Sequence, residues 1–316
     1  MKDSRQITQG ALMIGIYLIV LLMNIFIPYI GIVLFFALPL PFIVYSYRHG
    51  LKPGLIMLVA ATILGSLFGT VFSLPLTLMV GIGGLCIGTA LHRKRSPYET
   101  WAIGSVGFII GLVLVFLLTQ VLFGVNWIEE VKTMMDESFM ITENIMQQMP
   151  GDTEEVGQQI DAMKEQINRF PIYLPSIFAL MGIFFALISQ WVGYKAINRL
   201  ENKRLGFTKF RNFQLPVSLL WYYFIAMLLE MATNNQQDGT LYLAATNVFT
   251  LTGVLIALQG IAFLFYYVHA KGKSKALPIT AIVLTVLIPD LGLYLVRILG
   301  IIDIGFSLRN RLKETK

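Results

Sequence analysis

Eight long apolar runs dominate the sequence and constrain its fold more than any other feature. They cover residues 7–27, 32–47, 53–72, 76–91, 101–125, 171–194, 215–231 and 240–268. A helix of about 20 apolar residues crosses the hydrocarbon core of a bilayer. Lipid offers no hydrogen-bond partner to the backbone, so each run is predicted to be a transmembrane helix.

The composition excludes the other common classes of protein. Hydrophobic residues make up 56% of the chain, and charged residues only 13%. Soluble globular domains carry about 25% charged residues, and disordered chains are poor in apolar residues. We therefore predict an all-α, polytopic transmembrane helix bundle.

The last apolar stretch is interrupted by Pro289 and Asp290. Residues 276–288 are too few for a full span, whereas 291–306 are apolar apart from Arg297 and Asp303. We expect a helical hairpin bent at Pro289, forming either two spans or a re-entrant segment, which gives nine or ten membrane segments in all. Arg297 is expected to pair with Asp303 or Asp290.

The basic residues predict an orientation. Of the 24 lysines and arginines, 20 lie before residue 6, in segments 48–52, 92–100, 195–214 and 269–275, or after residue 307. An N-terminus in the cytoplasm places all of these inside, as the positive-inside rule requires. The sequence thus predicts a plasma-membrane protein with both termini cytoplasmic, and the basic clusters need no nucleic acid to explain them.

Residues 126–170 differ from the rest, with ten acidic and three basic residues. We expect an extracytoplasmic acidic helical hairpin, with one helix at 127–149 and a second carrying an apolar heptad stripe. That stripe comprises Val156, Ile160, Met163, Ile167 and Phe170. The two helices are expected to cover each other, the outer mouth of the bundle or a partner. The predicted organisation is 1–125 (helices 1–5), 126–170 (acidic insert), 171–197 (helix 6) and 198–316 (a basic loop and helices 7–10).

Motifs that carry chemistry are scarce. Gly272-Lys273-Ser274 lacks the earlier glycine of a phosphate-binding loop, since position 267 is Tyr267. The three histidines lie far apart in sequence and show no zinc-ligand spacing. We expect no catalytic residue, no metal site and no cofactor, and an intramembrane enzyme ranks third among the functions considered.

Small residues spaced four apart recur along the spans. Such pairs let helix backbones approach closely in lipid. The pairs are Ala11 and Gly15, Gly65 and Gly69, Gly84 and Gly88, and Gly107 and Gly111. We interpret such pairs as contacts between helices of this bundle. For Ala11 and Gly15, the alternative is contact with a partner membrane subunit.

Polar and aromatic residues at the outer ends of the spans suggest a ligand site, because polar groups within membrane helices are costly. The candidate ligand-binding residues are Asn24, Gln120, Asn126, Trp127 and Tyr173. The amides would supply hydrogen bonds and the two rings would close the site.

The first six spans resemble a known group of transporters. The residues that carry this resemblance are Ala11 and Gly15, the segment 28–31, Leu40-Pro41, Lys52-Pro53-Gly54 and Arg93-Lys94-Arg95. Over residues 1–197 they resemble the substrate-binding S components of energy-coupling-factor (ECF) vitamin transporters. The whole chain is similar to the YybS family of polytopic membrane proteins.

The S-component resemblance implies a six-helix unit that binds a small molecule in an outward pocket. It also implies a transmembrane coupling subunit and ATPases as partners, with Ala11 and Gly15 touching the coupling subunit. The leading function is therefore small-molecule binding or uptake. The alternative is a membrane scaffold without a ligand. Under either function, the lipid bilayer is an expected partner.

Overall fold

The computed structural model describes residues 2–147, 162–165, 167–236, 239–306, 308–309 and 312. The described residues form helices and connecting loops without a strand, which confirms the all-α prediction. The chain divides into two compact units, unit 1 (Met1–Gly206) and unit 2 (Phe207–Lys316).

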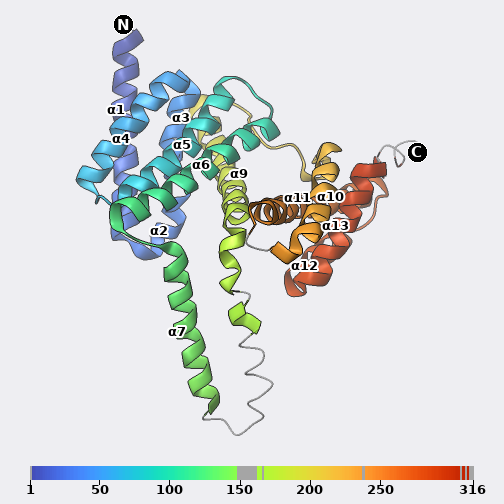
Figure 1. Ribbon diagram of the computed structural model, residues 1–316. Helices are drawn as coiled ribbons and strands as arrows, with labels where there is room; N and C mark the ends of the chain where they lie inside the picture. The colour runs from blue at the N-terminus through green and yellow to red at the C-terminus, as the bar shows by residue number, and fades with distance from the viewer. Residues whose placement is uncertain are drawn as a thin grey trace. The chain divides into compact units, whose positions relative to one another are not determined.

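Unit 1 contains the first six predicted spans and the acidic insert (Figure 1). Its helices are α1 (Lys2–Phe26), α2 (Pro28–Phe35), α3 (Leu40–His49), α4 (Leu51–Phe68), α5 (Ser73–His92), α6 (Pro97–Phe123), α7 (Trp127–Gln147), the short η1 (Phe170–Tyr173) and α9 (Leu174–Glu201). Helix α5 contacts α3, α4, α6 and α9 and is the centre of the unit.

Glycines explain how tightly the helices pack around α5. A Cβ atom on Gly84 would lie 2.7 Å from the Pro39 carbonyl oxygen, and one on Gly111 would lie 2.7 Å from the Met79 Cα. Only glycine allows these backbones to approach so closely. Three of the four small-residue pairs therefore serve packing within unit 1, since Gly65, Gly69, Gly88 and Gly107 also face close neighbours.

The second predicted span is broken. Residues 36–39 interrupt it between α2 and α3, and residues 28–31, which lie between the first two predicted spans, form the first turn of α2. Pro39 and Pro41 cannot donate backbone hydrogen bonds, so a continuous helix is interrupted there. The Arg48 Nε to Glu201 Oε1 ion pair (2.7 Å) joins the ends of α3 and α9.

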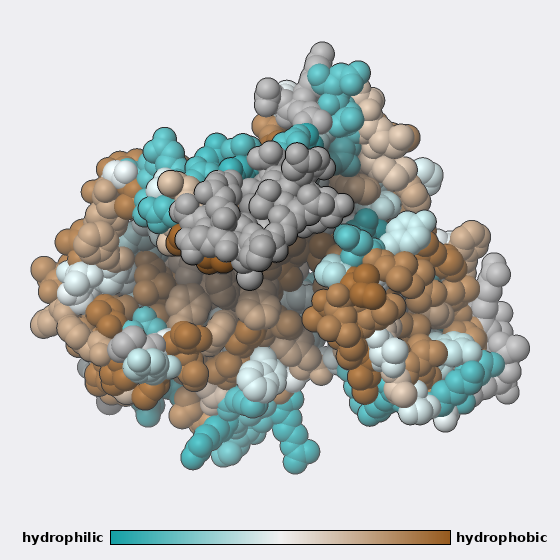
Figure 2. Space-filling view, turned by 90° about the horizontal axis from the view of Figure 1, so that it is seen from below, coloured by the Kyte–Doolittle hydropathy of each residue, from teal (hydrophilic) through white to brown (hydrophobic). Residues whose placement is uncertain are grey.

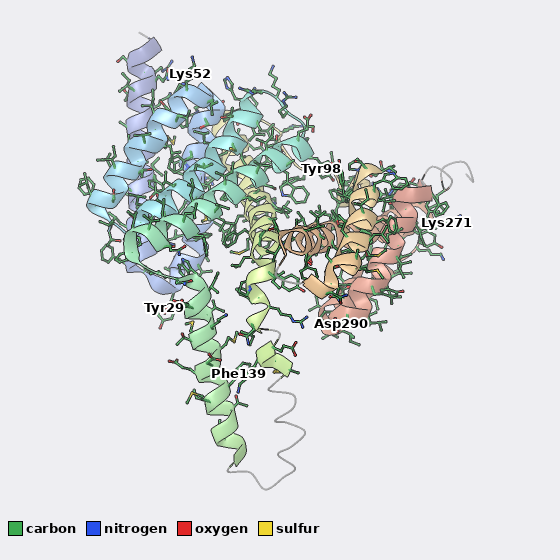
Figure 3. All side chains as sticks on the ribbon, viewed as in Figure 1. Tyr29, Lys52, Tyr98, Phe139, Lys271 and Asp290 are labelled. Carbon is green, nitrogen blue, oxygen red and sulfur yellow. The ribbon has the colours of Figure 1, made fainter. Side chains whose placement is uncertain are left out.

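Unit 2 consists of η2 (Phe210–Asn212), α10 (Ser218–Thr233), η3 (Asn234–Gln236), α11 (Thr240–Ala270), α12 (Ala276–Leu287) and α13 (Pro289–Phe306). Helices α12 and α13 pack against each other and form the predicted hairpin, with Pro289 opening α13. Figure 3 shows Lys271 and Asp290 at opposite ends of this unit, as the hairpin requires.

Helix α13 crosses α11 at two glycines. A Cβ atom on Gly300 or Gly260 would collide with the backbone of Ile256 or Val296, respectively. The two backbones are therefore in direct contact at the crossing.

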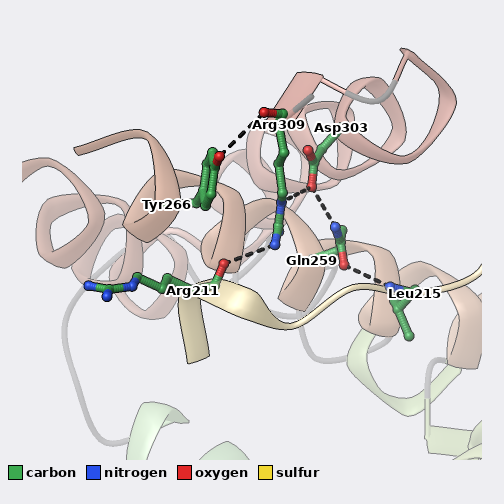
Figure 4. A network of polar contacts seen from close by, with 6 residues as sticks. All are labelled: Arg211, Leu215, Gln259, Tyr266, Asp303 and Arg309. Carbon is green, nitrogen blue, oxygen red and sulfur yellow. Dashed lines mark hydrogen bonds and ion pairs between the residues drawn. The ribbon is translucent and has the colours of Figure 1, made fainter. Parts of the chain in front are cut away.

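A buried polar network joins the C-terminal end of unit 2 to the loop before α10 (Figure 4). Arg309 Nε donates to Asp303 Oδ2 at 3.0 Å, and Gln259 Nε2 donates to the same oxygen. Arg309 Nη1 donates to the Arg211 carbonyl at 2.9 Å, while the Leu215 amide donates to Gln259 Oε1 at 3.1 Å.

The predicted pairing of Arg297 with Asp303 is therefore wrong, because Asp303 pairs with Arg309. The alternative pairing with Asp290 is also absent among the described residues. The Arg297 guanidinium instead lies 5.9 Å from the Tyr223 ring centroid and 5.8 Å from that of Phe249. These distances allow cation–π attraction. The Arg297 Nε has no hydrogen-bond partner among the described residues.

Seven described helical stretches are long and apolar enough to cross a membrane. They are Ser4–Phe26, Tyr29–His49, Leu51–Phe68, Ser73–His92, Pro97–Phe123, Phe170–Glu201 and Thr240–Ala270, with shorter apolar helices at Ser218–Thr233 and Ala276–Leu287. Hydrophobic residues cover much of the face seen in Figure 2.

Candidate ligand cavity and partner face

An apolar cavity of about 220 Å³ lies in unit 1, where the end of α6 meets the starts of α7 and α9. It is lined by Leu112, Val115, Phe116, Trp127, Ile128, Val131, Phe170, Leu174, Ile177, Phe178 and Met181. Small-molecule pockets usually measure about 300–1,000 Å³ and contain a few polar groups. This cavity therefore suits a small and apolar molecule.

Trp127 is the candidate ligand residue that lines this cavity. It is the first residue of α7, and its indole Nε1 donates to the Thr119 hydroxyl at 2.6 Å. This bond satisfies the donor of the indole and leaves the ring as an apolar wall.

Asn24 and Asn126 use their side chains to hold turns. Asn24 Nδ2 donates to the Gly31 carbonyl at 2.6 Å, which closes the turn between α1 and α2. Asn126 Oδ1 accepts from the amides of Ile128 (3.2 Å) and Glu129 (3.4 Å) at the start of α7. This is an N-cap, which satisfies amides that the helix itself leaves unpaired.

Gln120 and Tyr173 also lie outside the cavity lining. Gln120 is exposed near the end of α6, and the Tyr173 side chain is 37% exposed at the start of α9. The structure therefore brings one of the five candidates to the cavity, and ligand contact by the other four stays a prediction. Apolar residues form the rest of the lining, and nothing in an apolar run distinguishes them from residues that face lipid.

The acidic insert begins with α7, whose apolar side chains are largely exposed. Met134, Met140 and Ile141 are each at least 60% exposed, and Figure 3 shows Phe139 halfway along this helix. The Lys164 ammonium lies 5.8 Å from the Phe139 ring centroid, so the two arms of the insert approach each other there. Val156 and Ile160 of the predicted stripe lie outside the described residues.

Ala11 and Gly15 face away from the packed side of α1. Met13, Tyr17 and Leu21 are buried, and Tyr17 donates to the Thr77 hydroxyl at 2.7 Å. Ala11 and Gly15 each precede a buried residue by two positions, which turns them roughly 160° away from it on a helix. A Cβ atom on Gly15 would meet nothing within 4 Å, and Ala11 is exposed.

In the described ranges, no group of three or more His, Cys, Asp or Glu side chains comes together as a metal centre would need.

Sequence reasoning missed a convergence of basic residues in unit 2, described below. The signal for it was present as two separate basic clusters, and only the fold brings them to one place.

Comparison with known proteins agrees with this architecture. A family model described as "Predicted membrane protein (DUF2232)" matches residues 15–304. The protein named "Uncharacterized protein YybS" from Bacillus subtilis (strain 168) is 30% identical over 313 residues, which cover 99% of this chain and all of that protein. No solved structure matches the chain. The chain is thus a multi-pass membrane protein that belongs to the DUF2232 family, as its resemblance to YybS predicts.

Proposed function

We propose that unit 1 binds a small apolar molecule and works with a partner membrane subunit, in the manner of a transporter S component. The observation that carries this proposal is the cavity beside Trp127. The cavity is open on one side, so a small molecule can enter it. A cavity of about 220 Å³ with an all-apolar lining therefore supports a ligand of matching character.

The orientation that we propose places this cavity at the outer side of a plasma membrane. Helix α6 follows the basic cluster Arg93-Lys94-Arg95, so its start is assigned to the cytoplasm and its end to the outside. The cavity lies at the outer end, where a molecule from outside the cell would enter. Both chain termini are then cytoplasmic.

The strip formed by exposed Ala11 and by Gly15, which has open space beside it, supports docking of a partner helix. Helices in lipid associate through close backbone contact at small residues. The other glycine pairs meet neighbours within unit 1, whereas Gly15 has open space beside it. A coupling subunit with ATPases is the partner class that the S-component resemblance suggests.

The test of binding is to fill the cavity. We expect that a small apolar molecule is extracted from the full-length protein purified from its native membrane and is detected by mass spectrometry. Val115→Trp places an indole in the cavity and should lower the amount recovered by about tenfold or more, equivalent to at least about 1.4 kcal/mol.

The matched control is Val121→Trp. Val121 lies on the same helix but is 79% exposed, so the same substitution there leaves the cavity open. Equal recovery from both variants would show that the molecule binds elsewhere. If the wild-type protein yields no molecule, the scaffold function takes precedence, and the exposed apolar side chains of α7 become its docking face.

A further inference from the structure

Basic side chains from two separate segments line one pocket in unit 2. The pocket has a volume of about 550 Å³ and is lined by Lys209, Phe210, Arg211, Phe265, Val268, His269, Gly272, Lys273 and Lys275. Four of these nine residues are lysine or arginine, and none is acidic. The pocket therefore attracts an anion.

The four cationic side chains have no acidic partner in the part of the chain that the structure describes. Among the described residues, no carboxylate forms an ion pair with Lys209, Arg211, Lys273 or Lys275. Lys273 Nζ donates to the Tyr267 hydroxyl, at 3.4 Å. An anion that enters the pocket thus meets positive charge that no described carboxylate pairs with.

Buried contacts hold the wall of this pocket in place. The Arg211 carbonyl accepts the Arg309 hydrogen bond, and the Leu215 amide is fixed by Gln259. The Phe210 ring packs edge-on against Phe265, with centroids 6.0 Å apart. The short segment before α10 is therefore fastened to α11, and its basic side chains face a preformed cavity.

The position of the pocket along α11 selects the kind of anion. Phe265 and Val268 belong to the last turns of the candidate span Thr240–Ala270, so the pocket lies at the end of a membrane helix. Lipid headgroups occupy this level. The pocket also combines a basic rim with apolar side chains, which suits an amphiphile better than a fully hydrated anion.

Apolar grooves continue from the same end of α11. One groove of about 400 Å³ is lined by Phe263, Leu264, Tyr267, Leu277, Leu299, Leu308 and Leu312. A second of about 390 Å³ shares Leu264, Leu277 and Leu299 with it and extends along α12 and α13. Tyr267 lines the first groove and bonds Lys273 of the basic pocket, so the basic and apolar surfaces adjoin.

We propose that the basic pocket of unit 2 binds the phosphate headgroup of an anionic phospholipid whose acyl chains lie in the adjoining grooves of α11, α12 and α13. Basic pockets at the ends of membrane helices recognise such headgroups through charge and hydrogen bonds. This site is separate from the cavity of unit 1. The proposed lipid binding does not depend on whether that cavity holds a ligand.

The test compares phosphatidylglycerol with phosphatidylcholine on the full-length protein in detergent micelles, using native mass spectrometry. The wild type should retain phosphatidylglycerol at least about tenfold more strongly. The double variant Lys209→Gln and Lys275→Gln removes two pocket charges and should weaken retention about 30-fold. Equal retention of the two lipids by the wild type would overturn the proposal.

A matched double variant separates the pocket from general surface charge. Lys203→Gln with Lys271→Gln also removes two positive charges, from exposed residues that do not line the pocket (Lys271 is labelled in Figure 3). It should retain phosphatidylglycerol within about threefold of the wild type. If both double variants lose the lipid equally, the pocket has no special role and the proposal fails.

Two further measurements distinguish a lipid from a soluble phosphate compound and do not depend on how the variants fold. Inorganic pyrophosphate should displace phosphatidylglycerol no better than chloride at the same ionic strength. Displacement by a low concentration of pyrophosphate would show that the pocket binds a soluble phosphate compound and not a lipid. Phosphatidylglycerol with a photoreactive acyl chain should cross-link to wild-type residues 263–267 or 277–299. Cross-links confined to unit 1 would contradict the proposal.

Discussion

Arg309 and Asp303 form an ion pair of 3.0 Å in which the side chains are only 4% and 1% exposed, respectively. The second carboxylate oxygen of Asp303 and the Nη2 of Arg309 have no partner among the described residues. Each charge therefore depends mainly on the other for its compensation. Burial of a charge without a partner is strongly unfavourable.

Replacing Arg309 with Met should destabilise unit 2, because it leaves the Asp303 carboxylate buried and unpaired. Loss of one partner from a buried ion pair costs about 3–5 kcal/mol. Adding Asp303→Asn removes the orphaned charge, so the double variant should be more stable than Arg309→Met alone. Denaturant unfolding in detergent measures the free energy of unfolding of each variant. A double variant that is less stable than both single variants would contradict this account.

The close crossing of α11 and α13 predicts that an added methyl group destabilises the protein at Gly300 much more than at Gly206. Gly300→Ala forces a methyl group against the Ile256 backbone and should lower the free energy of unfolding by about 1–3 kcal/mol. Gly206→Ala has nothing within 4 Å and should change the free energy by less than about 1 kcal/mol. Thermal melts of the two proteins provide the comparison, and equal melting temperatures would show that the crossing tolerates a side chain.

Gly15→Leu tests the partner face of α1. The added side chain meets open space within the chain, so the protein should fold with a melting temperature close to that of the wild type. A partner whose backbone approaches Gly15 would be displaced, since bulky residues keep membrane helices apart. Pull-down from solubilised membranes should recover the partner with the wild type and lose it with Gly15→Leu. Recovery of every partner by the folded variant would remove support for coupling through α1.

The orientation is tested by cysteine labelling in a Cys86→Ala background. Met134 is 63% exposed on α7, and Lys203 is exposed after α9. Met134→Cys should react with an impermeant maleimide in intact cells, whereas Lys203→Cys should react only after the membrane is opened. The reverse pattern would invert the topology and place the cavity beside Trp127 on the cytoplasmic side.

The number and type of the main elements follow from the sequence because lipid leaves the backbone little choice. An apolar run without water must satisfy its own hydrogen bonds, and a helix does so within one segment. The hairpin at Pro289 was predictable for a related reason, since proline opens a helix but does not continue one. The break before α3 was missed, although Pro39 and Pro41 mark it, because the hydropathy across these residues stays high.

Tertiary structure decides which face of each helix points inward, and hydropathy carries no information about this rotation when every face is apolar. Asn24 and Asn126 are predicted ligand contacts, and only the fold shows that Asn24 Nδ2 and Asn126 Oδ1 bond nearby backbone groups. Asp303 pairs with Arg309 and not with Arg297, because Arg297 lies against two aromatic rings. Gly15 and Gly84 belong to the same sequence pattern, and only packing shows that Gly15 has open space beside it whereas Gly84 lies against a neighbouring backbone. The basic pocket likewise exists because the fold brings residues 209–211 to the end of α11, a proximity that their separation in the chain leaves undetermined.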